Sequence, residues 1–361
     1  MIVISSNTGN YLNLQIFGES HGEAVGFVLD AFPSGIPIDK DVLNRYLERR
    51  RPGKKSSTLR KETDQIHWLS GIKDEYSNGN PISAIFYNKD HHSKDYDPLS
   101  DVPRPSHGDY PYRVKFGSHA ETIGGGHYSG RLTLPLTAAG ALCQQVLKRY
   151  GINSCTFLTQ IGEMRFPDYE SLDENRINEV EKQEIPVLAN EKEASFYINE
   201  IRTQKDSVGS TVQAVFQNLP IGLGSPFFQG LDSRIASILF SIPGVKSVEF
   251  GDGAILSQMK GSVANDPYYY DGRIQLKSNH NGGVLAGLST GESLIVTVHI
   301  KPTPSIGLSQ DSVNLKTKEN EKLQMNGRHD PCIGIRATVV VEAAINFVLA
   351  DLLLENENGF K

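Results

Sequence analysis

The sequence has few cysteines, and it lacks both a long apolar run and a leader-like N-terminus. Its three cysteines, Cys143, Cys155 and Cys332, are an odd number without paired Cys-x-x-Cys spacing, so neither a disulfide framework nor a structural zinc site is indicated. No run of about 18 or more apolar residues occurs, and residues 1–6 lack the basic region and cleavage pattern of a signal peptide. We therefore expect a cytoplasmic protein with reduced thiols, no metal and no membrane partner.

The net charge of the chain is small and negative. The chain has 36 Lys and Arg residues against 42 Asp and Glu residues, a net charge of −6. This balance disfavours general affinity for nucleic acid but is compatible with a local basic pocket. The hydrophobic fraction of 38% and the charged fraction of 22% are those of an ordinary globular protein. They argue against disorder and allow a large core in one or two domains.

Apolar spacing predicts a helix soon after residue 38. Asp39 is a good N-cap, and Leu43, Tyr46 and Leu47 fall on one face of the helix that follows. The helix should end at Pro52-Gly53, since these two residue types terminate helices.

Further helices are predicted later in the chain. Over 132–151 the apolar residues recur at near-helical spacing, with Pro135 in the first turn, where proline is tolerated. Asp232 is expected to cap a helix that continues through 235–239. The segment 337–354 is apolar nearly all round, which indicates a helix buried in a large core or in an oligomer interface.

The remaining pattern favours a layered α+β fold. Strand-like runs occupy 2–16, 212–217 and 294–300, but strands and helices do not alternate regularly enough for a Rossmann fold. No clean linker divides the chain. We therefore expect a single domain over 1–361, with an acidic surface insertion near 165–195.

Three short segments each join an acid or a base to glycine, proline or arginine. They are Gly18-Glu19-Ser20-His21-Gly22, Arg104-Pro105-Ser106-His107-Gly108-Asp109 and Arg328-His329-Asp330-Pro331-Cys332. Histidine suits proton transfer because its unperturbed pKa lies near neutral pH, and arginine suits the binding of an anion. The chain has ten histidines, so a histidine outside such a context is a poor catalytic candidate. A zinc site is also a poor interpretation, because no short pair of ligands is followed by a second pair.

A basic cluster follows the first predicted helix. Seven basic residues lie between positions 49 and 61, namely Arg49, Arg50, Arg51, Lys54, Lys55, Arg60 and Lys61. Arginine offers paired donors that match phosphate and carboxylate groups. A solvated loop or a weak RNA-binding patch is the alternative interpretation.

Two loops could bind a phosphate-bearing ligand. The glycine-rich stretch 124–130 precedes a predicted helix, whose free N–H groups and positive dipole end suit a phosphate; a flexible turn is the alternative. The loop 301–305 carries one cation and two hydroxyl groups and is stiffened by two prolines, although a turn that ends a strand would look the same. Glycines recur at 282–283, which hints at a duplicated unit.

The three acid–base segments, in this order, resemble the chorismate synthase family from about Asn7 to about Leu354. Members of that family convert 5-enolpyruvylshikimate 3-phosphate to chorismate with reduced flavin mononucleotide (FMN). The resemblance implies a β-α-β sandwich with internal pseudo-symmetry, assembled as a homotetramer. It also implies an anti-1,4 elimination of phosphate without net redox change, in which NADPH serves only as a source of reduction.

The resemblance also implies roles for individual residues. His107 would protonate the leaving phosphate, His21 would protonate the reduced flavin or steady its charge, and Asp330 would lie near the flavin N5. The implied substrate-binding residues are Arg49, Arg50, Arg51, Arg104 and Arg336. The implied cofactor-binding residues are Gly126, His127, Tyr128, Ser129, Arg131, Ala286, Lys301, Pro302, Thr303, Pro304, Ser305 and Arg328.

The sequence departs from the family pattern at several of these positions. His127, Tyr128, Leu132 and Leu136 replace the usual arginine, serine, glutamate and arginine; Pro304 replaces serine and Ala286 replaces glycine. Ser56 stands where many relatives have an arginine thought to touch a nicotinamide cofactor, which favours a separate flavin reductase as partner. A flavoprotein oxidoreductase of the same fold and a noncatalytic anion- or RNA-binding protein are the alternative functions.

Overall fold

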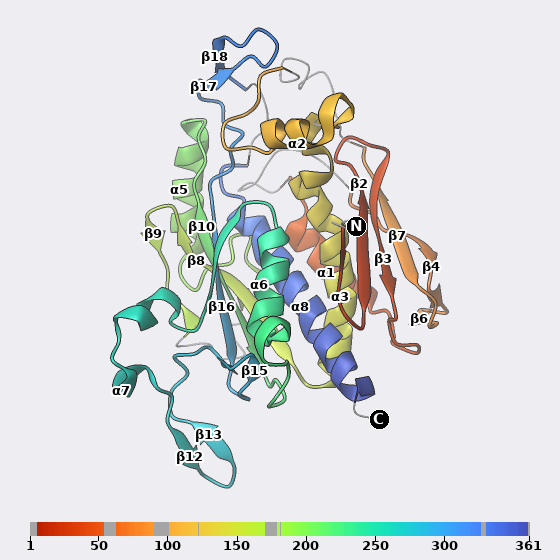
Figure 1. Cartoon of the computed structure of the whole chain (residues 1–361), viewed down its shortest axis with the longest axis vertical. Coiled ribbons are helices and arrows are strands. Elements are labelled where there is room, and N and C mark those ends of the chain that lie inside the picture. Colours follow the sequence, from red (N-terminus) through yellow and green to blue (C-terminus); the bar gives the residue numbers. More distant parts are fainter. Residues whose placement is uncertain are drawn as a thin grey trace.

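Two five-stranded sheets enclose a layer of helices in the computed structural model (Figure 1). The structure describes residues 6–53, 63–89, 101–121, 123–169, 179–180, 182–325 and 330–359. Strand pairing within both sheets is antiparallel. The predicted α+β layered fold is therefore confirmed.

The first sheet turns one face toward the helices. Its strands, in spatial order, are β1 (Asn7–Thr8), β2 (Asn13–Gly18), β3 (Ala24–Asp30), β7 (Ile82–Tyr87) and β4 (His67–Ser70). Val25, Phe27 and Leu29 alternate along β3 and are completely buried. This period of two is the expected pattern for a strand with one face against a core.

The second sheet has β10 at its centre. Its strands, in spatial order, are β11 (Val245–Phe250), β16 (Leu294–Ile300), β10 (Ser210–Gln217), β8 (Asn153–Ile161) and β9 (Met164–Arg165). β10 pairs with β8 and β16 along nearly its whole length, and residues 210–216 are buried.

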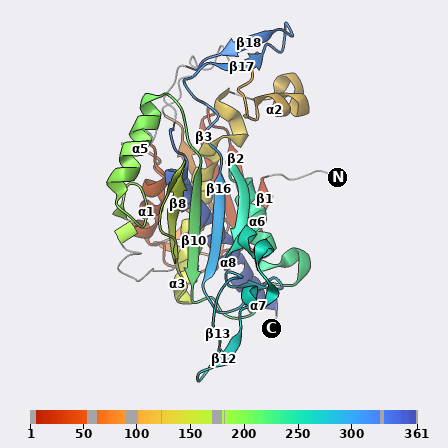
Figure 2. The same cartoon turned by 90° about the vertical axis from the view of Figure 1, so that its left-hand side faces the viewer.

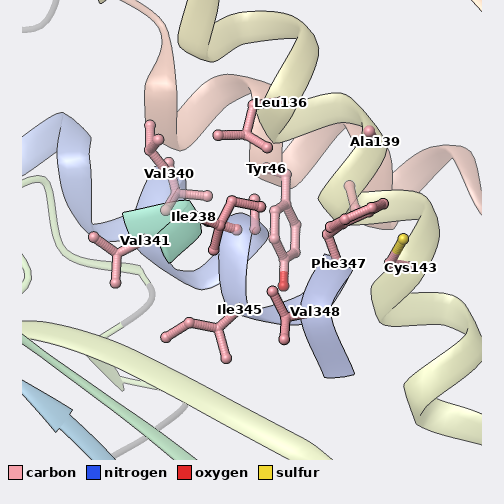
Figure 3. Packing of buried hydrophobic residues seen from close by; sticks show 14 of the residues in the cluster. Tyr46, Leu136, Ala139, Cys143, Ile238, Val340, Val341, Ile345, Phe347 and Val348 are labelled. Atoms are coloured by element: carbon pink, nitrogen blue, oxygen red, sulfur yellow. The ribbon is translucent and has the colours of Figure 1, made fainter. Parts of the chain in front are cut away.

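Four helices fill the space between the sheets. They are α1 (Lys40–Arg50), α3 (Thr133–Arg149), α6 (Leu231–Ser241) and α8 (Gly334–Gly359). α8 is long and apolar enough to cross a membrane, but its apolar window is wholly buried inside the protein. Figure 3 shows side chains of α8 packed against Tyr46 of α1 and Leu136 of α3. The prediction of a buried helix over 337–354 is confirmed.

The contact between α3 and α8 depends on a glycine. A Cβ atom at Gly140 would lie 2.2 Å from the backbone oxygen of Ala343. Only glycine allows the two backbones to approach this closely, so α3 and α8 pack at a shorter distance than larger residues there would allow.

Most helix predictions are confirmed. The Asp39 side chain caps α1 by accepting from the backbone N–H groups of Asp41 and Val42, and Pro135 lies in the first turn of α3. The cap prediction for Asp232 is wrong. Gly230 is the N-cap of α6, and the Asp232 carboxylate instead accepts from the N–H of Ser233, because the helix begins before it reaches Asp232.

The two halves of the chain repeat one topology. When the short strands and the helices outside the central layer are set aside, the order along the chain is β2-β3-α1-β4-β7-α3 in the first half and β8-β10-α6-β11-β16-α8 in the second half. The corresponding strands also lie in the same spatial order, β2-β3-β7-β4 and β8-β10-β16-β11. The glycine-rich turns that hinted at a duplication are not equivalent, because 124–126 precedes α3 whereas 282–283 precedes β16.

Shorter elements decorate the two ends of the sandwich. Figures 1 and 2 place α2 (Asp109–Phe116) and the hairpin of β17 (Gln310–Val313) and β18 (Asn320–Leu323) at one end, and the hairpin of β12 (Tyr268–Tyr270) and β13 (Ile274–Leu276) at the opposite end. The remaining elements are β5 (Ile72–Lys73), β6 (Tyr76–Ser77), α5 (Glu191–Thr203), α7 (Gly261–Ala264), β14 (Val284–Leu285) and β15 (Leu288–Ser289).

The predicted acidic insertion near 165–195 is described only in part. Within it, Ile185 and Val187 are completely buried. Val187 forms a parallel bridge to Leu158 of β8, and the backbone oxygen of Pro186 accepts from the N–H of Leu158 at 2.7 Å. This part of the segment therefore lies alongside the second sheet.

Candidate functional site

A cavity of about 450 Å³ lies where the first turns of α3 and α8 meet the loops around them. The lining includes His21, His107 and Asp330, which come from all three acid–base segments. It also includes six cationic side chains, those of Arg50, Arg104, Arg131, Lys246, Lys301 and Arg336. The volume is in the range of small-molecule sites, and the charge suits a ligand with several anionic groups.

The duplicated topology explains why distant segments meet here. The connection from β7 to α3 and the connection from β16 to α8 occupy equivalent places in the two halves. The first contains residues 104–109 and the second contains Lys301 and Asp330. Because both connections lead into helices of the same layer, residues about 200 positions apart line one cavity.

His107 and Asp109 form a hydrogen-bonded pair. His107 Nδ1 lies 2.8 Å from Asp109 Oδ1, and Arg104 donates to both Asp109 oxygens at 2.7 Å. The hydroxyl group of Tyr128 donates to Oδ1 at 3.1 Å. Burial works to raise the pKa of Asp109, but the hydrogen bonds from Arg104 and His107 outweigh it and hold that pKa well below its usual range.

The ionised Asp109 determines the state of the imidazole. A carboxylate can only accept, so Nδ1 of His107 carries a hydrogen and Nε2 remains for proton exchange with a ligand. Burial lowers the pKa of His107, and the hydrogen bond to Asp109 opposes this effect in part.

Lys301 fastens the loop that carries His107. Its ammonium group donates to the backbone oxygen of Ser106, whose φ of +57° is unusual for a residue other than glycine. Arg104 Nη1 reaches Ser305 Oγ at 3.4 Å. The two loops therefore brace each other at the edge of the cavity.

His21 enters the cavity from the turn between β2 and β3. The Ser20 hydroxyl group lies 3.0 Å from His21 Nδ1 and donates to the backbone oxygen of Gly124 at 3.2 Å. Gly124 has φ +60°, and a Cβ atom there would lie 1.9 Å from the imidazole. The glycine-rich loop therefore provides the space in which the His21 ring lies.

Three arginines and a carboxyl group gather at the first turn of α8. Arg336 donates to Asp330 Oδ2 at 3.0 Å and to the backbone oxygen of Arg50 at 2.8 Å. Burial raises the pKa of Asp330, and the positive charge of Arg336 opposes that rise. Burial and the nearby Arg336 lower the pKa of Arg50 to about 9. Arg131 completes the group.

The sequence and the structure of this chain were compared with those of known proteins. Residues 12–354 match the family described as chorismate synthase. The chain belongs to the chorismate synthase family. It is 39% identical over 353 residues to the chorismate synthase of Thermococcus gammatolerans, and the aligned region covers 97% of this chain and 98% of that protein. It is also 41% identical over 349 residues to the chorismate synthase of Archaeoglobus fulgidus, with 96% of each chain covered.

A solved structure agrees with this assignment. A crystal structure of chorismate synthase superposes with a TM-score of 0.75 at 25% sequence identity, over 97% of this chain and 94% of the other. The protein is therefore an enzyme of the lyase class, from a family that acts in amino-acid biosynthesis.

Of the three consecutive arginines expected to bind a chorismate synthase substrate, only Arg50 lines the cavity among the described residues. Arg49 instead donates to Glu342 Oε2 at 2.7 Å and to Thr156 Oγ1 at 2.9 Å. The Arg51 side chain lies 3.9 Å from Glu48. Successive residues of a helix point in directions about 100° apart, so three neighbours at its end cannot all face one site.

The residues expected to bind the family's cofactor divide in the same way. Tyr128, Ser129, Arg131 and the whole loop 301–305 line the cavity, whereas Gly126, His127 and Ala286 do not belong to its described lining. The ring nitrogens of His127 lie 2.8 Å from the backbone oxygen of Gly18 and 2.7 Å from Ser6 Oγ. Arg328 and Ser56 lie outside the described residues, as do Lys54, Lys55, Arg60 and Lys61.

Ala286 lies in the turn between β14 and β15. It has φ +52°, a conformation in which the glycine usual in the family would be unstrained. The adjacent segment 278–283 is held by Asp266, which accepts from the backbone N–H groups of His280 and Asn281.

Besides Asp109, which lies in a motif but receives no role from the sequence, two residues of the site are not predicted from sequence. Lys246, on β11, lies beside Lys301 because Val245 pairs with Ile300. Asp64 lies behind the cavity and bonds to both Arg50 and Arg131. Neither belongs to a recognisable motif, so only the pairing of β11 with β16 could have indicated Lys246.

Proposed function

We propose that the chain catalyses the family's reaction, the elimination of phosphate from 5-enolpyruvylshikimate 3-phosphate to give chorismate. One observation carries this proposal. A single cavity contains six cationic side chains, a histidine paired with an ionised carboxylate, and a buried carboxyl group whose pKa is raised. Binding of a polyanion and proton transfer are both needed for the reaction, and these residues supply both.

Anion binding comes from side chains and helix ends together. The substrate carries one phosphate and two carboxylate groups. Arg50, Arg131 and Arg336 lie near the first turns of α3 and α8, where free backbone N–H groups and the positive dipole end also favour an anion. Lys246 and Lys301 supply positive charge from the second sheet. The cavity can therefore hold several anionic groups of one or two ligands.

The lining also suits a reduced flavin beside the substrate. Thr303 Oγ1 and Asp330 Oδ1 are buried and have no hydrogen-bond partner among the residues that the structure describes. A ligand with polar ring atoms would satisfy such groups. Tyr128, Ser129, Arg131 and the loop 301–305 would hold reduced FMN. When bound, it supplies electron density to the allylic system of the substrate and recovers it, so no net redox change occurs.

Proton transfer is assigned to three residues. His107 donates a proton from Nε2 to the leaving phosphate, while Asp109 holds Nδ1–H and stabilises the imidazolium form. Because the phosphate is negatively charged, its arrival favours the protonated form that burial disfavours. Asp330 takes up the proton that the substrate loses from C6 as the second ring double bond forms, and its raised pKa suits that role. His21, beside the glycine-rich loop, would stabilise the charge of the reduced flavin.

Assembly and supply of electrons extend the same proposal. We propose a cytoplasmic homotetramer that relies on a separate reductase, with NADPH only as the source of reduction. Phe227 and Phe228, which lie in the turn before α6 and are 87% and 90% exposed, support burial of this surface against another subunit. Light scattering of the purified protein tests the assembly, because a monomeric mass contradicts it.

An anaerobic assay tests the proposed function. The purified protein is given 5-enolpyruvylshikimate 3-phosphate and chemically reduced FMN, and chorismate and phosphate are followed together. Equal release of both, with none under oxidised flavin, is expected. Consumption of NADPH in proportion to product would instead indicate a flavoprotein oxidoreductase.

A further inference from the structure

One buried carboxylate outside the cavity lining joins two of the arginines that line it. Asp64 lies in the loop before β4, and its side chain is 0% exposed. Its Oδ2 accepts from Arg50 Nη1 at 3.3 Å, and its Oδ1 accepts from Arg131 Nη1. Arg50 ends α1, and Arg131 lies two residues before the start of α3. A single carboxylate therefore ties together three segments that are separated in sequence.

The backbone at Asp64 adopts a sparsely populated conformation. Its φ of +47° lies in the left-handed region, which aspartate and asparagine tolerate better than most residues. A conformation of this kind is strained and persists only where the surrounding contacts hold it in place. Here the ion pairs of Asp64 with Arg50 and Arg131 hold the backbone in this conformation.

Each arginine held by Asp64 has further bonds that fix its orientation. Arg50 Nη2 donates to the backbone oxygen of Gly130 at 3.0 Å, and its Nε donates to Thr133 Oγ1 at 3.3 Å. Arg131 Nε donates to Asn88 Oδ1 at 2.9 Å. Since both side chains still line the cavity, their guanidinium groups meet a ligand in one fixed arrangement.

Asp64 also offsets repulsion among three cations. Three charged groups surround Arg50. Arg131 comes from the segment before α3, and Asp330 and Arg336 come from the region where α8 begins. Burial and the charges of Arg336 and Arg131 lower the pKa of Arg50 to about 9, whereas Asp64 works to raise it. Without the Asp64 carboxylate, Arg50 would release its proton at lower pH and the guanidinium groups would repel one another.

We propose that Asp64 is a positioning residue for the anionic ligand: it holds the guanidinium groups of Arg50 and Arg131 as a preformed pair that binds a phosphate or carboxylate group. This inference rests on the proposed function, since it names a residue that prepares the same cavity. Preorganised donors lose less freedom on binding than donors that must first be ordered. Asp64 therefore increases affinity without touching the ligand.

The test compares two asparagine variants. Asp64→Asn keeps the shape and tolerates the same backbone, but removes the charge. Asp74→Asn is the matched control, because Asp74 has φ +51° and is exposed in the turn between β5 and β6. Binding of inorganic phosphate and of 5-enolpyruvylshikimate 3-phosphate is measured by calorimetry between about pH 7 and pH 10, a window that includes the pKa of about 9 to which burial and the nearby cations lower Arg50.

Asp64→Asn is expected to weaken binding of both ligands by about 10- to 100-fold, the usual loss for charge-assisted bonds. KM should rise more than kcat falls, and the alkaline loss of binding should move to lower pH because Arg50 loses its partner. Asp74→Asn should match the wild-type protein. Unchanged affinity and pH dependence in a folded Asp64→Asn variant would overturn the inference.

Two more variants keep the inference testable if Asp64→Asn does not fold. Asp64→Glu restores the charge and should return the alkaline limb toward its wild-type position. Arg131→Gln also weakens binding, but it removes a neighbouring positive charge, so the alkaline limb should move to higher pH. A shift to lower pH in Arg131→Gln would contradict the inference.

These outcomes separate the inference from the proposed function. If the wild-type protein binds phosphate with the expected pH dependence but releases no chorismate, the proposed function fails and the inference stands. If turnover is normal and the Asp64→Asn variant binds as tightly as the wild-type protein, the inference alone fails.

Discussion

The imidazole ring of His21 occupies the space in which a side chain at Gly124 would lie. A Cβ atom at Gly124 would come within 1.9 Å of Cε1 and 2.1 Å of Nδ1 of that ring. The φ of +60° at Gly124 also suits glycine. The position of the His21 ring therefore requires glycine at position 124.

We predict that Gly124→Ala removes most of the activity. The methyl group displaces the His21 ring and strains a left-handed backbone, and loss of a positioned acid or base typically costs about 10²–10⁴ in rate. The measurement is kcat for chorismate formation under anaerobic conditions. Gly117→Ala is the control, because Gly117 also has a positive φ, +73°, but has nothing within 4 Å of its Cβ position. Equal activity in both variants would contradict the prediction.

A second prediction concerns the partner of His107. Asp109→Asn can no longer fix the hydrogen on Nδ1, so kcat should fall by about 10²–10⁴, whereas Asp311→Asn on an exposed strand should leave it unchanged. Because the Asp109 hydrogen bond raises the pKa of His107, its loss lowers that pKa further. A general acid is active while protonated, so activity falls as pH rises through the pKa of His107. In the variant this alkaline decline should begin at a lower pH than in the wild-type protein. A pH profile of kcat that keeps its position would contradict this assignment.

The sequence predicts the chemistry of this site better than its geometry. Arg104, His107 and Asp109 share one short motif, so the sequence places them together, but the hydrogen bond between His107 and Asp109 comes from the structure. The resemblance to a family supplied His21 and Asp330, and the structure brings both to the same cavity. Short-range patterns and shared motifs therefore suffice for residues that act within one segment.

Long-range partners could not be predicted from the sequence. Arg49, Arg50 and Arg51 look equivalent as a run, but the helix turns Arg49 toward Glu342 and only Arg50 toward the cavity. Asp64 and Lys246 belong to no motif, and their roles depend on which segments the two sheets bring together. The duplicated topology, which decides that, is visible in strand order and not in the glycine turns that hinted at it.

A third prediction separates stability from binding at Arg49. Arg49→Ala leaves Glu342 buried without its cation, and breaking a buried ion pair typically lowers the free energy of unfolding by about 3–5 kcal/mol. Burial raises the pKa of Glu342, but Arg49 and Tyr46 outweigh it and keep that pKa lowered. The pair therefore stabilises the fold above the unfolded pKa of about 4.3, and this contribution is lost as pH falls.

Denaturant unfolding at pH 7 and at pH 4 measures the effect of Arg49→Ala. The loss of stability should be larger at pH 7, and KM for the substrate should change little because Arg49 does not line the cavity. Arg51→Ala serves as the control, since its contact with Glu48 at 3.9 Å is a partly exposed i, i+3 pair of small value. A raised KM with unchanged stability in Arg49→Ala would instead make Arg49 a substrate ligand.

The fourth prediction concerns Lys246, the cation contributed by β11. Burial and the charge of Lys246 lower the pKa of Lys301, so the two ammonium groups repel each other when no ligand is bound. An anion between them removes that repulsion, which means that each lysine favours binding. Lys246→Gln should therefore weaken binding of the substrate or of FMN by about 10-fold, the loss of one charge-assisted contact, and should reduce the dependence of binding on salt. Lys260→Gln, at an exposed position before α7, should change neither. Unchanged affinity for both ligands in Lys246→Gln would mean that Lys301 and the arginines alone bind the anions.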